Sequence, residues 1–303
     1  SLNGFKRQRQ TDASLIRIYF RYICVQNRSM YTEYQPSHLL VPYIDSYWEF
    51  KGNPDYGMRI HILPDGCTDF IFTLGEVANA VEEGSLIMQP YRSYFVGPMT
   101  KYSELVTYTE SIHMFGVRFL PCGLSCFTNL PLHEFVNSRV STNEMKAVFD
   151  DTFIEKLGEQ KHVTDRIRVV EEYLLAYLAR HYQPADSHVA MAVNMINHSK
   201  GKRSVRSLMD DVCLCQRHFE RKFKHYTGFT PKEYSRIVKF KNAVELLRTT
   251  TSANLLTTAV DAGYYDLAHF SKEIKSMSGN TPASFLSLTV PEETTLTYIE
   301  PQR

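Results

Sequence analysis

The sequence lacks an apolar run of the length that a membrane-spanning helix requires, about 18–20 residues. Arg17 and Arg21 interrupt residues 15–25, so this segment is neither a membrane span nor a convincing signal peptide. Residues 1–29 also differ in periodicity from the residues that follow. We therefore expect no membrane partner, and we interpret Met30 as a candidate start, with residues 1–29 as an upstream extension or a cloning remnant.

Cysteine is scarce and lacks the spacing of a metal or disulfide site. The six cysteines form no paired CxxC motif and no disulfide framework; they lie at positions 24, 67, 122, 126, 213 and 215. Reduced thiols in the cytoplasm are the simplest interpretation. Cys122 and Cys126 are more typical of small buried apolar positions than of an oxidant or metal sensor.

Signatures of catalysis are absent as well. No His-x-His pair occurs, and His61 and His113 stand alone. The chain also has no nucleophile elbow and no phosphate-binding glycine loop. The sequence therefore predicts no catalytic residue, no metal site and no cofactor.

Net charge is small, but the two parts of the chain differ. The whole chain carries +1, yet residues 188–288 hold 15 lysines and arginines against 8 aspartates and glutamates, a balance of +7. The remaining residues carry −6. Such a split is expected when one domain faces phosphates; clustering on a solvated surface is the alternative.

A repeated segment lies in this basic region. Residues 218–231 read HFERKFKHYTGFTP and residues 269–282 read HFSKEIKSMSGNTP, with six of fourteen positions identical. Such a repeat indicates one supersecondary unit used twice. Two similar basic helices on one body suit double-helical DNA, which itself repeats about every 34 Å.

Capping and stop signals surround both copies. Ser204 can cap a first helix, and Gly228 suits the left-handed end of the second. Pro231 then opens a long helix, and Gly279 ends the matching helix of the second copy. The pattern predicts two helix-turn-helix units joined by a long helix. The alternative is an all-α bundle that does not bind DNA.

Two longer motifs contain the repeat: SLMDDVCLCQRHFERKFKHYTGFTPKEY and AVDAGYYDLAHFSKEIKSMSGNTPASF. With them, residues 204–285 resemble the DNA-binding domain of the AraC/XylS family of bacterial transcription regulators. The resemblance implies that the second helix of each unit enters one of two successive major grooves. It also implies base contacts from Arg217, Glu220, Arg221, Ala268, His269 and Lys272.

The chemistry of these residues fits base reading. Arginine pairs bidentately with guanine, glutamate accepts from cytosine N4, and alanine packs on a thymine methyl. Lys272 stands where the family often has arginine, so we expect the second half-site to be read less strictly. His269 is also a candidate for packing or for phosphate contact. Phosphate contacts are expected from Lys200, Lys202, Arg203, Ser204, Arg206 and Lys224.

The N-terminal half has a period of two, with glycine and proline at the turns. Strand-like runs cover residues 58–63, 68–74, 93–96, 105–109 and 113–119, which predicts a small β-barrel or sandwich. The stretches YIDSYWEF, HILPDGCTDFIF, YFVGPM and GVRFLP resemble the cupin-like sensor domains of such regulators. The expected fold is α+β and multidomain: a β-barrel or cupin-like domain with flanking helices, followed by an all-α domain.

A sensor needs an apolar cavity with a few polar groups. Candidate effector contacts are Tyr47, Trp48, His61, Asp65, Asp69, His113, Phe115 and Arg118. Structural roles are the alternatives, with Trp48 in the core, Asp65 as a turn former and Arg118 in a salt bridge.

A helix ending near His181 carries an apolar seam with alternating steps of four and three. Its members are Val163, Ile167, Val170, Leu174 and Tyr177. The seam suits packing on the barrel as well as pairing with a second subunit, and the family resemblance favours a dimer. The expected parts of the chain are an extension (1–29), a cupin-like sensor domain (30–140), a helical linker or dimerisation region (141–183), a DNA-binding domain (184–290) and a tail (291–303).

The sequence thus predicts a cytoplasmic, sequence-specific bacterial transcription regulator, and an activator more than a repressor. Its expected partners are double-stranded DNA, a small-molecule effector, RNA polymerase and a second copy of the chain. One alternative is a regulator without an effector, whose barrel serves dimerisation or protein contact. Another is an enzyme or DNA-repair protein fused to the DNA-binding module.

Overall fold

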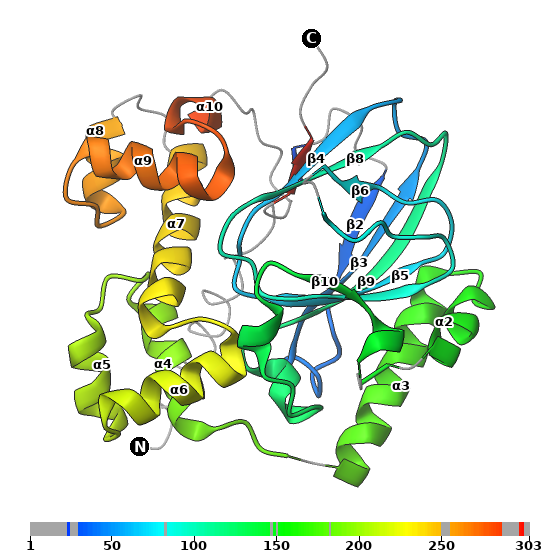
Figure 1. Cartoon of the computed structure of the whole chain (residues 1–303), viewed down its shortest axis with the longest axis horizontal. Helices are drawn as coiled ribbons and strands as arrows, with labels where there is room; N and C mark the ends of the chain where they lie inside the picture. The colour runs from blue at the N-terminus through cyan, green and yellow to red at the C-terminus, as the bar shows by residue number, and fades with distance from the viewer. Residues whose placement is uncertain are drawn as a thin grey trace, which may run out of the picture.

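The computed structural model describes residues 23–24, 30–81, 84–145, 148–149, 151–181, 183–249, 255–286 and 297–299. A sheet-rich domain forms the N-terminal part of the chain and a helical domain the C-terminal part (Figure 1). This arrangement confirms the predicted α+β multidomain fold. Most of the expected extension (1–29) and tail (291–303) lies outside the described residues.

The strands form two sheets. The larger follows the order β10 (Arg139–Ser141), β7 (Ser93–Val96), β5 (Thr68–Thr73), β9 (Ile112–Phe119), β3 (Ile44–Gly52) and β2 (Tyr31–Tyr34). The smaller follows β1 (Ile23–Cys24), β11 (Thr297–Ile299), β4 (Met58–Ile62), β8 (Ser103–Thr107) and β6 (Asn79–Ala80). Neighbouring strands are antiparallel, except β1 and β11.

The expected barrel is not closed. Among the described strands, no hydrogen-bonded pair joins one sheet to the other. The two sheets instead face each other across an apolar core, which includes Trp48 and Phe50 from β3 and Ile60 from β4.

The larger sheet is buried on both faces, so successive residues of one strand serve different cores. Trp48 faces the smaller sheet, whereas its neighbour Tyr47 belongs to a second core on the opposite face. Helices α2 (Asp151–Gly158) and α3 (Val163–His181) cover that second face (Figure 1).

The apolar seam of α3 packs back onto the sheet. Val170 and Leu174 are fully buried within the chain itself, and Val163, Ile167 and Tyr177 lie around the same core. Val170 and Leu174 thus belong to the intrachain packing, one of the two arrangements open from the sequence. Val163, Ile167 and Tyr177 are only partly buried.

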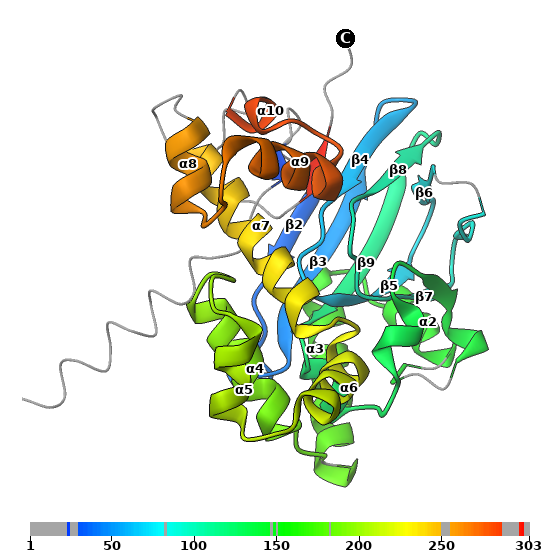
Figure 2. The same cartoon turned by 60° about the vertical axis from the view of Figure 1, so that its left-hand side comes forward.

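The helical domain consists of α4 (Ser187–His198), α5 (Val205–Val212), α6 (Gln216–Thr227), α7 (Pro231–Thr249), α8 (Leu255–Asp261), α9 (Leu267–Ser278) and α10 (Pro282–Leu286). Helix α7 runs between a lobe of α4–α6 and a lobe of α8–α10 (Figure 2). Among the described residues, no helix combines the length and apolarity needed to cross a membrane.

Candidate nucleic-acid interface and small-molecule pocket

Local capping fixes the first helix-turn-helix unit. The Ser204 hydroxyl accepts a hydrogen bond from the Ser207 N–H at 3.1 Å and caps α5. Phe219 and Phe223, four residues apart on α6, are fully buried and hold α6 against the domain core. Gly228 ends α6 with φ +83°, a left-handed conformation that glycine adopts without strain. These features confirm the predicted first unit.

The exposed side of α6 carries the predicted base-reading residues. Arg217 and Arg221 are exposed, and Glu220 is half-buried. Gln216 donates a hydrogen bond to the Glu220 carboxylate at 2.9 Å, which orients that group along the helix. The structure therefore brings these three predicted residues together on one surface.

The second unit repeats this arrangement. Asp266 caps α9 by accepting a hydrogen bond from the His269 N–H at 2.7 Å, and Phe270 is buried in the domain core. Ala268, His269 and Lys272 are exposed at the corresponding positions. We call α6 and α9 the recognition helices.

Polar bridges connect the second lobe to α7 and to the first lobe. The Arg236 guanidinium on α7 donates two hydrogen bonds to the Glu273 carboxylate on α9, both at 3.0 Å. Lys202 donates to the backbone carbonyl of Asp261, at the end of α8, at 2.6 Å. These contacts hold the recognition helices in a defined relative position.

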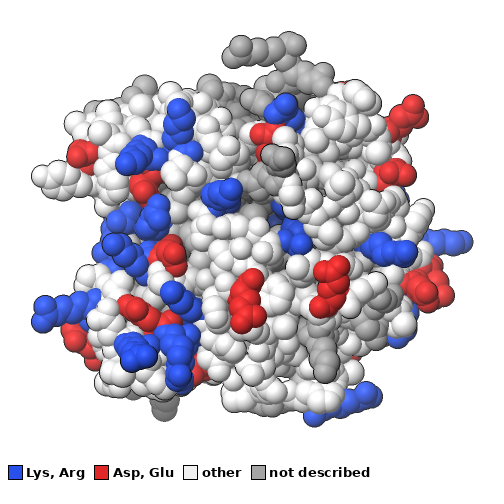
Figure 3. Space-filling view, in the orientation of Figure 1, with Lys and Arg blue, Asp and Glu red and all other residues white. Residues whose placement is uncertain are grey.

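The predicted phosphate contacts fall into three groups. Arg206 and Lys224 are exposed, and basic side chains gather over the helical domain on the left of Figure 3. Arg203 pairs with Asp211, and Lys202 bridges the lobes, so both already have partners within the domain. The remaining predicted phosphate contacts are Lys200, in the turn after α4, and Ser204, the cap of α5.

Polar contacts hold α6 both within its own domain and against the sheet-rich domain. Within the domain, Lys222 pairs with Asp186, the N-cap of α4, at 2.6 Å. His225 and the Asn129 side chain are joined by a 2.9 Å hydrogen bond. Position and orientation of α6 therefore depend partly on the sheet-rich domain.

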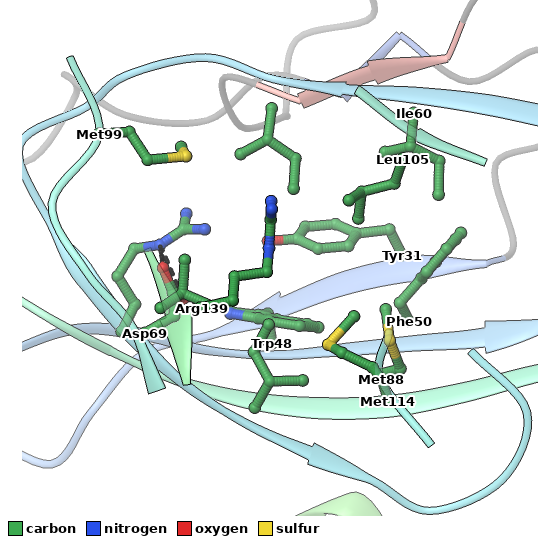
Figure 4. Close-up of a pocket in the computed structure, with 14 residues that line it drawn as sticks. Tyr31, Trp48, Phe50, Ile60, Asp69, Met88, Met99, Leu105, Met114 and Arg139 are labelled. Carbon is green, nitrogen blue, oxygen red and sulfur yellow. Dashed lines mark hydrogen bonds and ion pairs between the residues drawn. The ribbon is translucent and has the colours of Figure 1, made fainter. Parts of the chain in front are cut away.

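A cavity of about 70 Å³ lies between the two sheets (Figure 4). Its lining is mostly apolar and includes Tyr31, Trp48, Phe50, Ile60, Ile62, Ile71, Met88, Val96, Met99, Leu105 and Met114. Three charged residues complete it: Asp69, Arg118 and Arg139. An apolar cavity with a few convergent polar groups is the usual form of a small-molecule site.

The charged side of the cavity is a hydrogen-bonded network. The Trp48 indole N–H donates to Asp69 Oδ1 at 2.7 Å, and Arg118 Nε donates to the same oxygen at 3.2 Å. Burial raises the pKa of Asp69, against the lowering effect of the Arg118 charge. Burial alone lowers the pKa of Arg118, but Asp69 and other neighbouring anions raise it well above its ordinary value.

The predicted effector contacts divide between the two faces of the larger sheet. Trp48, Asp69 and Arg118 line the cavity. Tyr47 and Phe115 belong to the core under α2 and α3, so they face away from the cavity.

The other predicted effector contacts also lie outside the cavity lining. His113 is hydrogen-bonded to Glu49 at 3.0 Å. His61 is buried and stacks on Tyr102, with ring centroids 6.1 Å apart. Asp65 accepts a hydrogen bond from the Cys67 N–H at 2.8 Å, the role of a turn former.

Sequence reasoning missed several lining residues. Tyr31 and Arg139 come from β2 and β10, strands that the sequence pattern did not reveal. Met88, Met99 and Met114 are far apart in the chain, and no sequence signal unites them. In the described part of the chain, no group of three or more His, Cys, Asp or Glu side chains is arranged to hold a metal ion.

Comparisons with known proteins match the two domains separately. Residues 32–141 match a family described as "Domain of unknown function (DUF6597)", and residues 208–287 match one described as "Helix-turn-helix domain". No curated protein is significantly similar to the chain.

Solved structures with a similar fold include ToxT from Vibrio cholerae, at 9% identity and a TM-score of 0.48 over 82% of this chain and 100% of that chain. A probable AraC family transcriptional regulator from Rhodopseudomonas palustris CGA009 matches at 20% identity and a TM-score of 0.32, over 35% of this chain and 100% of that one. The resemblance drawn from the sequence is confirmed: the chain joins an N-terminal DUF6597 domain to a C-terminal DNA-binding domain of the AraC type.

Proposed function

We propose that this protein is a sequence-specific transcription regulator that places α6 and α9 in two successive major grooves of one duplex. The observation that carries the proposal is the pair of recognition helices, each exposed on one side and ended by a glycine, held apart by α7. The proposed regulator acts in the bacterial cytoplasm and activates transcription by contacting RNA polymerase.

The two recognition helices differ in how strictly they read bases. Arg217 and Arg221 on α6 offer two planar guanidinium groups for guanine, and Glu220 between them offers a carboxylate that can accept from a cytosine amine. On α9, Lys272 offers a single point charge and Ala268 only a methyl contact. The half-site under α6 therefore dominates sequence choice, and the half-site under α9 adds affinity.

The sheet-rich domain acts as a sensor of a small, largely apolar molecule with one polar end. Apolar side chains make up most of the cavity lining, and Asp69, Arg118 and Arg139 supply the polar end. The effector shifts the protein between two states only by binding one of them more tightly.

Selection from random duplexes tests the DNA-binding function. We expect the purified full chain to enrich one bipartite sequence, with an affinity that falls steeply as salt concentration rises because phosphate-bound counterions are released. Equal binding to the enriched duplex and to random competitor would contradict the proposal.

Trp48 gives a direct test of sensing, because it is the one tryptophan of the chain and lines the cavity. We expect one class of apolar metabolites in a library to change its fluorescence and to raise the melting temperature, since a ligand of the native state stabilises it. If no compound does either, the regulator works without an effector, and the sheets serve protein contact.

A further inference from the structure

The loop between β7 and β8, residues 97–102, touches the C-terminal ends of both recognition helices. A Cβ atom at Gly228, the C-cap residue of α6, would lie 2.5 Å from Pro98 Cγ. A Cβ atom at Gly279, the C-cap residue of α9, would lie 2.7 Å from Tyr102 Cζ. Two side chains of one short loop therefore pack directly on the backbone of two helix ends, 51 residues apart in sequence.

The same loop forms part of the cavity wall. Met99 lines the cavity, together with Val96 just before the loop. The cavity of about 70 Å³ holds only a few water molecules, so a larger molecule enters only if the lining moves. Methionine is unbranched and has three rotatable bonds, so Met99 is among the lining residues that yield most readily.

Hydrogen bonds make the loop move as a unit with residues 132–138. The Asn137 N–H donates to the carbonyl of Pro98, and the Thr100 N–H donates to the Asn137 side chain, both at 2.8 Å. A Cβ atom at Gly97 would lie 1.9 Å from the carbonyl oxygen of Phe135, so the two segments are in close backbone contact. The loop has little freedom to absorb a displacement internally.

The neighbouring segment reinforces the contact with α6. The carbonyl oxygen of Leu132, in the short helix η3 (Leu132–Phe135), would lie 3.2 Å from the same Cβ atom at Gly228. Helix α6 also packs on η3. A shift of the loop and η3 together therefore reaches the end of α6 directly.

We propose that residues 97–102 are a lever that converts occupation of the cavity into a change in the relative position of α6 and α9. Pro98 and Tyr102 hold the two helix ends in one arrangement. A molecule in the cavity displaces Met99 and the braced loop, and both helix ends are released. This lever deepens the proposed function, since it states how the sensor domain regulates the DNA-binding domain.

Distance measurement between spin labels tests the lever without DNA and without a known effector. Labels are placed by Lys224→Cys on α6 and Lys275→Cys on α9, two exposed residues at matching positions of the repeat, after Cys24, Cys213 and Cys215 are replaced by serine. We expect one narrow distance distribution in the otherwise unchanged full chain. Tyr102→Ala removes the ring that packs on Gly279 and stacks on His61, and Met99→Trp overfills the cavity. Both should broaden or shift the distance distribution.

Two variants serve as controls. Tyr102→Phe keeps the ring that packs on Gly279, and Tyr108→Ala removes an exposed ring at the far end of β8. Both should keep the narrow distribution. If Tyr102→Ala and Met99→Trp keep it as well while remaining folded by circular dichroism, the lever does not exist.

A spacing assay separates the lever from the proposed function. One base pair inserted between the half-sites rotates the second half-site by about 35° relative to the first. Because its two recognition helices are held in one arrangement, we expect the unchanged protein to lose at least about tenfold in affinity. Tyr102→Ala, whose helices are released, should lose less than about threefold. If Tyr102→Ala broadens the distance distribution but the unchanged protein shows no sequence-specific DNA binding, the lever is supported and the proposed regulatory function is refuted. Specific binding with equal spacing dependence in both proteins would refute the lever alone.

Discussion

The side-chain amine of Lys241, on α7, donates a 2.8 Å hydrogen bond to the backbone carbonyl of Asp65, in the turn between β4 and β5. This bond joins the helix between the two DNA-binding lobes to the sheet-rich domain. Burial lowers the pKa of Lys241, and the nearby Arg118 charge adds to this effect. The carboxylates of Asp65 and Asp45 act in the opposite direction.

Lys241→Met should destabilise the contact between the domains. The substitution keeps the apolar stem but removes the donor to the Asp65 carbonyl and the cation near the Asp65 and Asp45 carboxylates. We expect a loss of about 1–3 kcal/mol in unfolding free energy. Chemical denaturation measures it. Lys232→Met, at an exposed position of the same helix, is the matched control and should change stability by less than about 0.5 kcal/mol. Equal stability of the two variants would contradict a structural role for the Lys241 bond.

Arg221→Ala should relax base preference at one position of the operator. A lost bidentate contact with guanine costs about 1–3 kcal/mol for that base pair and little for the others. Lys224→Ala, one turn further along α6, should weaken binding to all sequences alike and reduce the salt dependence. Titration of both variants against operators with single substitutions distinguishes the two roles. A uniform loss for Arg221→Ala would exclude it from base reading.

Glu49→Gln should loosen α3 from the sheet at neutral pH. The Glu49 carboxylate accepts hydrogen bonds from Arg166 of α3 at 2.9 Å and pairs with His113 at 3.0 Å. Burial raises the pKa of Glu49, but the hydrogen bond with His113 and the charges of His113 and Arg166 outweigh it, and the pKa is lowered.

The sign of the pH dependence follows from this lowered pKa. The unfolded state takes up the proton first as pH falls, so the contribution of Glu49 is complete above about pH 4.5 and disappears as pH falls through the native pKa. We expect a difference of about 1–3 kcal/mol between Glu49→Gln and the unchanged protein at pH 7, shrinking towards zero as pH falls through the lowered native pKa. Glu155→Gln, an exposed control on α2, should show no such difference. A gap that persists at low pH would mean that the carboxylate charge does not matter.

Gly116→Ala should displace Trp48, which forms part of the cavity wall. A Cβ atom at Gly116 would lie 1.9 Å from Trp48 Cε2, so the indole must move and its hydrogen bond to Asp69 weakens. Overpacking of this kind costs about 1–3 kcal/mol. We expect a shift in tryptophan emission and a lower unfolding midpoint. Gly158→Ala, where an added Cβ meets nothing within 4 Å, should leave both unchanged. An unshifted emission in Gly116→Ala would place Trp48 elsewhere.

The helical domain was predictable because its signals are local. Ser204 and Gly228 act within one turn of their own helices. Because residues 269–282 repeat residues 218–231, the second helix-turn-helix unit could be predicted from the first. Of the five strand-like runs, all became strands, with ends within about two residues. The run from 93 to 96 agrees at both ends.

The cavity was only partly predictable because its residues depend on long-range pairing. In a sheet buried on both faces, apolar and polar positions do not reveal which face meets the second sheet. Trp48 and Tyr47 are equally good candidates from composition, and only the pairing of β3 with β9 places one in the cavity and the other under α3. The seam of α3 was ambiguous for the same reason.

Hydroxyl-radical footprinting of the full chain on its selected duplex tests the central claim most directly. We predict two protected segments about 10 base pairs apart on one face of the duplex. Arg221→Ala should weaken protection of one segment, and Lys272→Ala that of the other. A single protected segment that both substitutions weaken alike, or protection indistinguishable from that of random DNA, would contradict the use of α6 and α9 as two recognition helices.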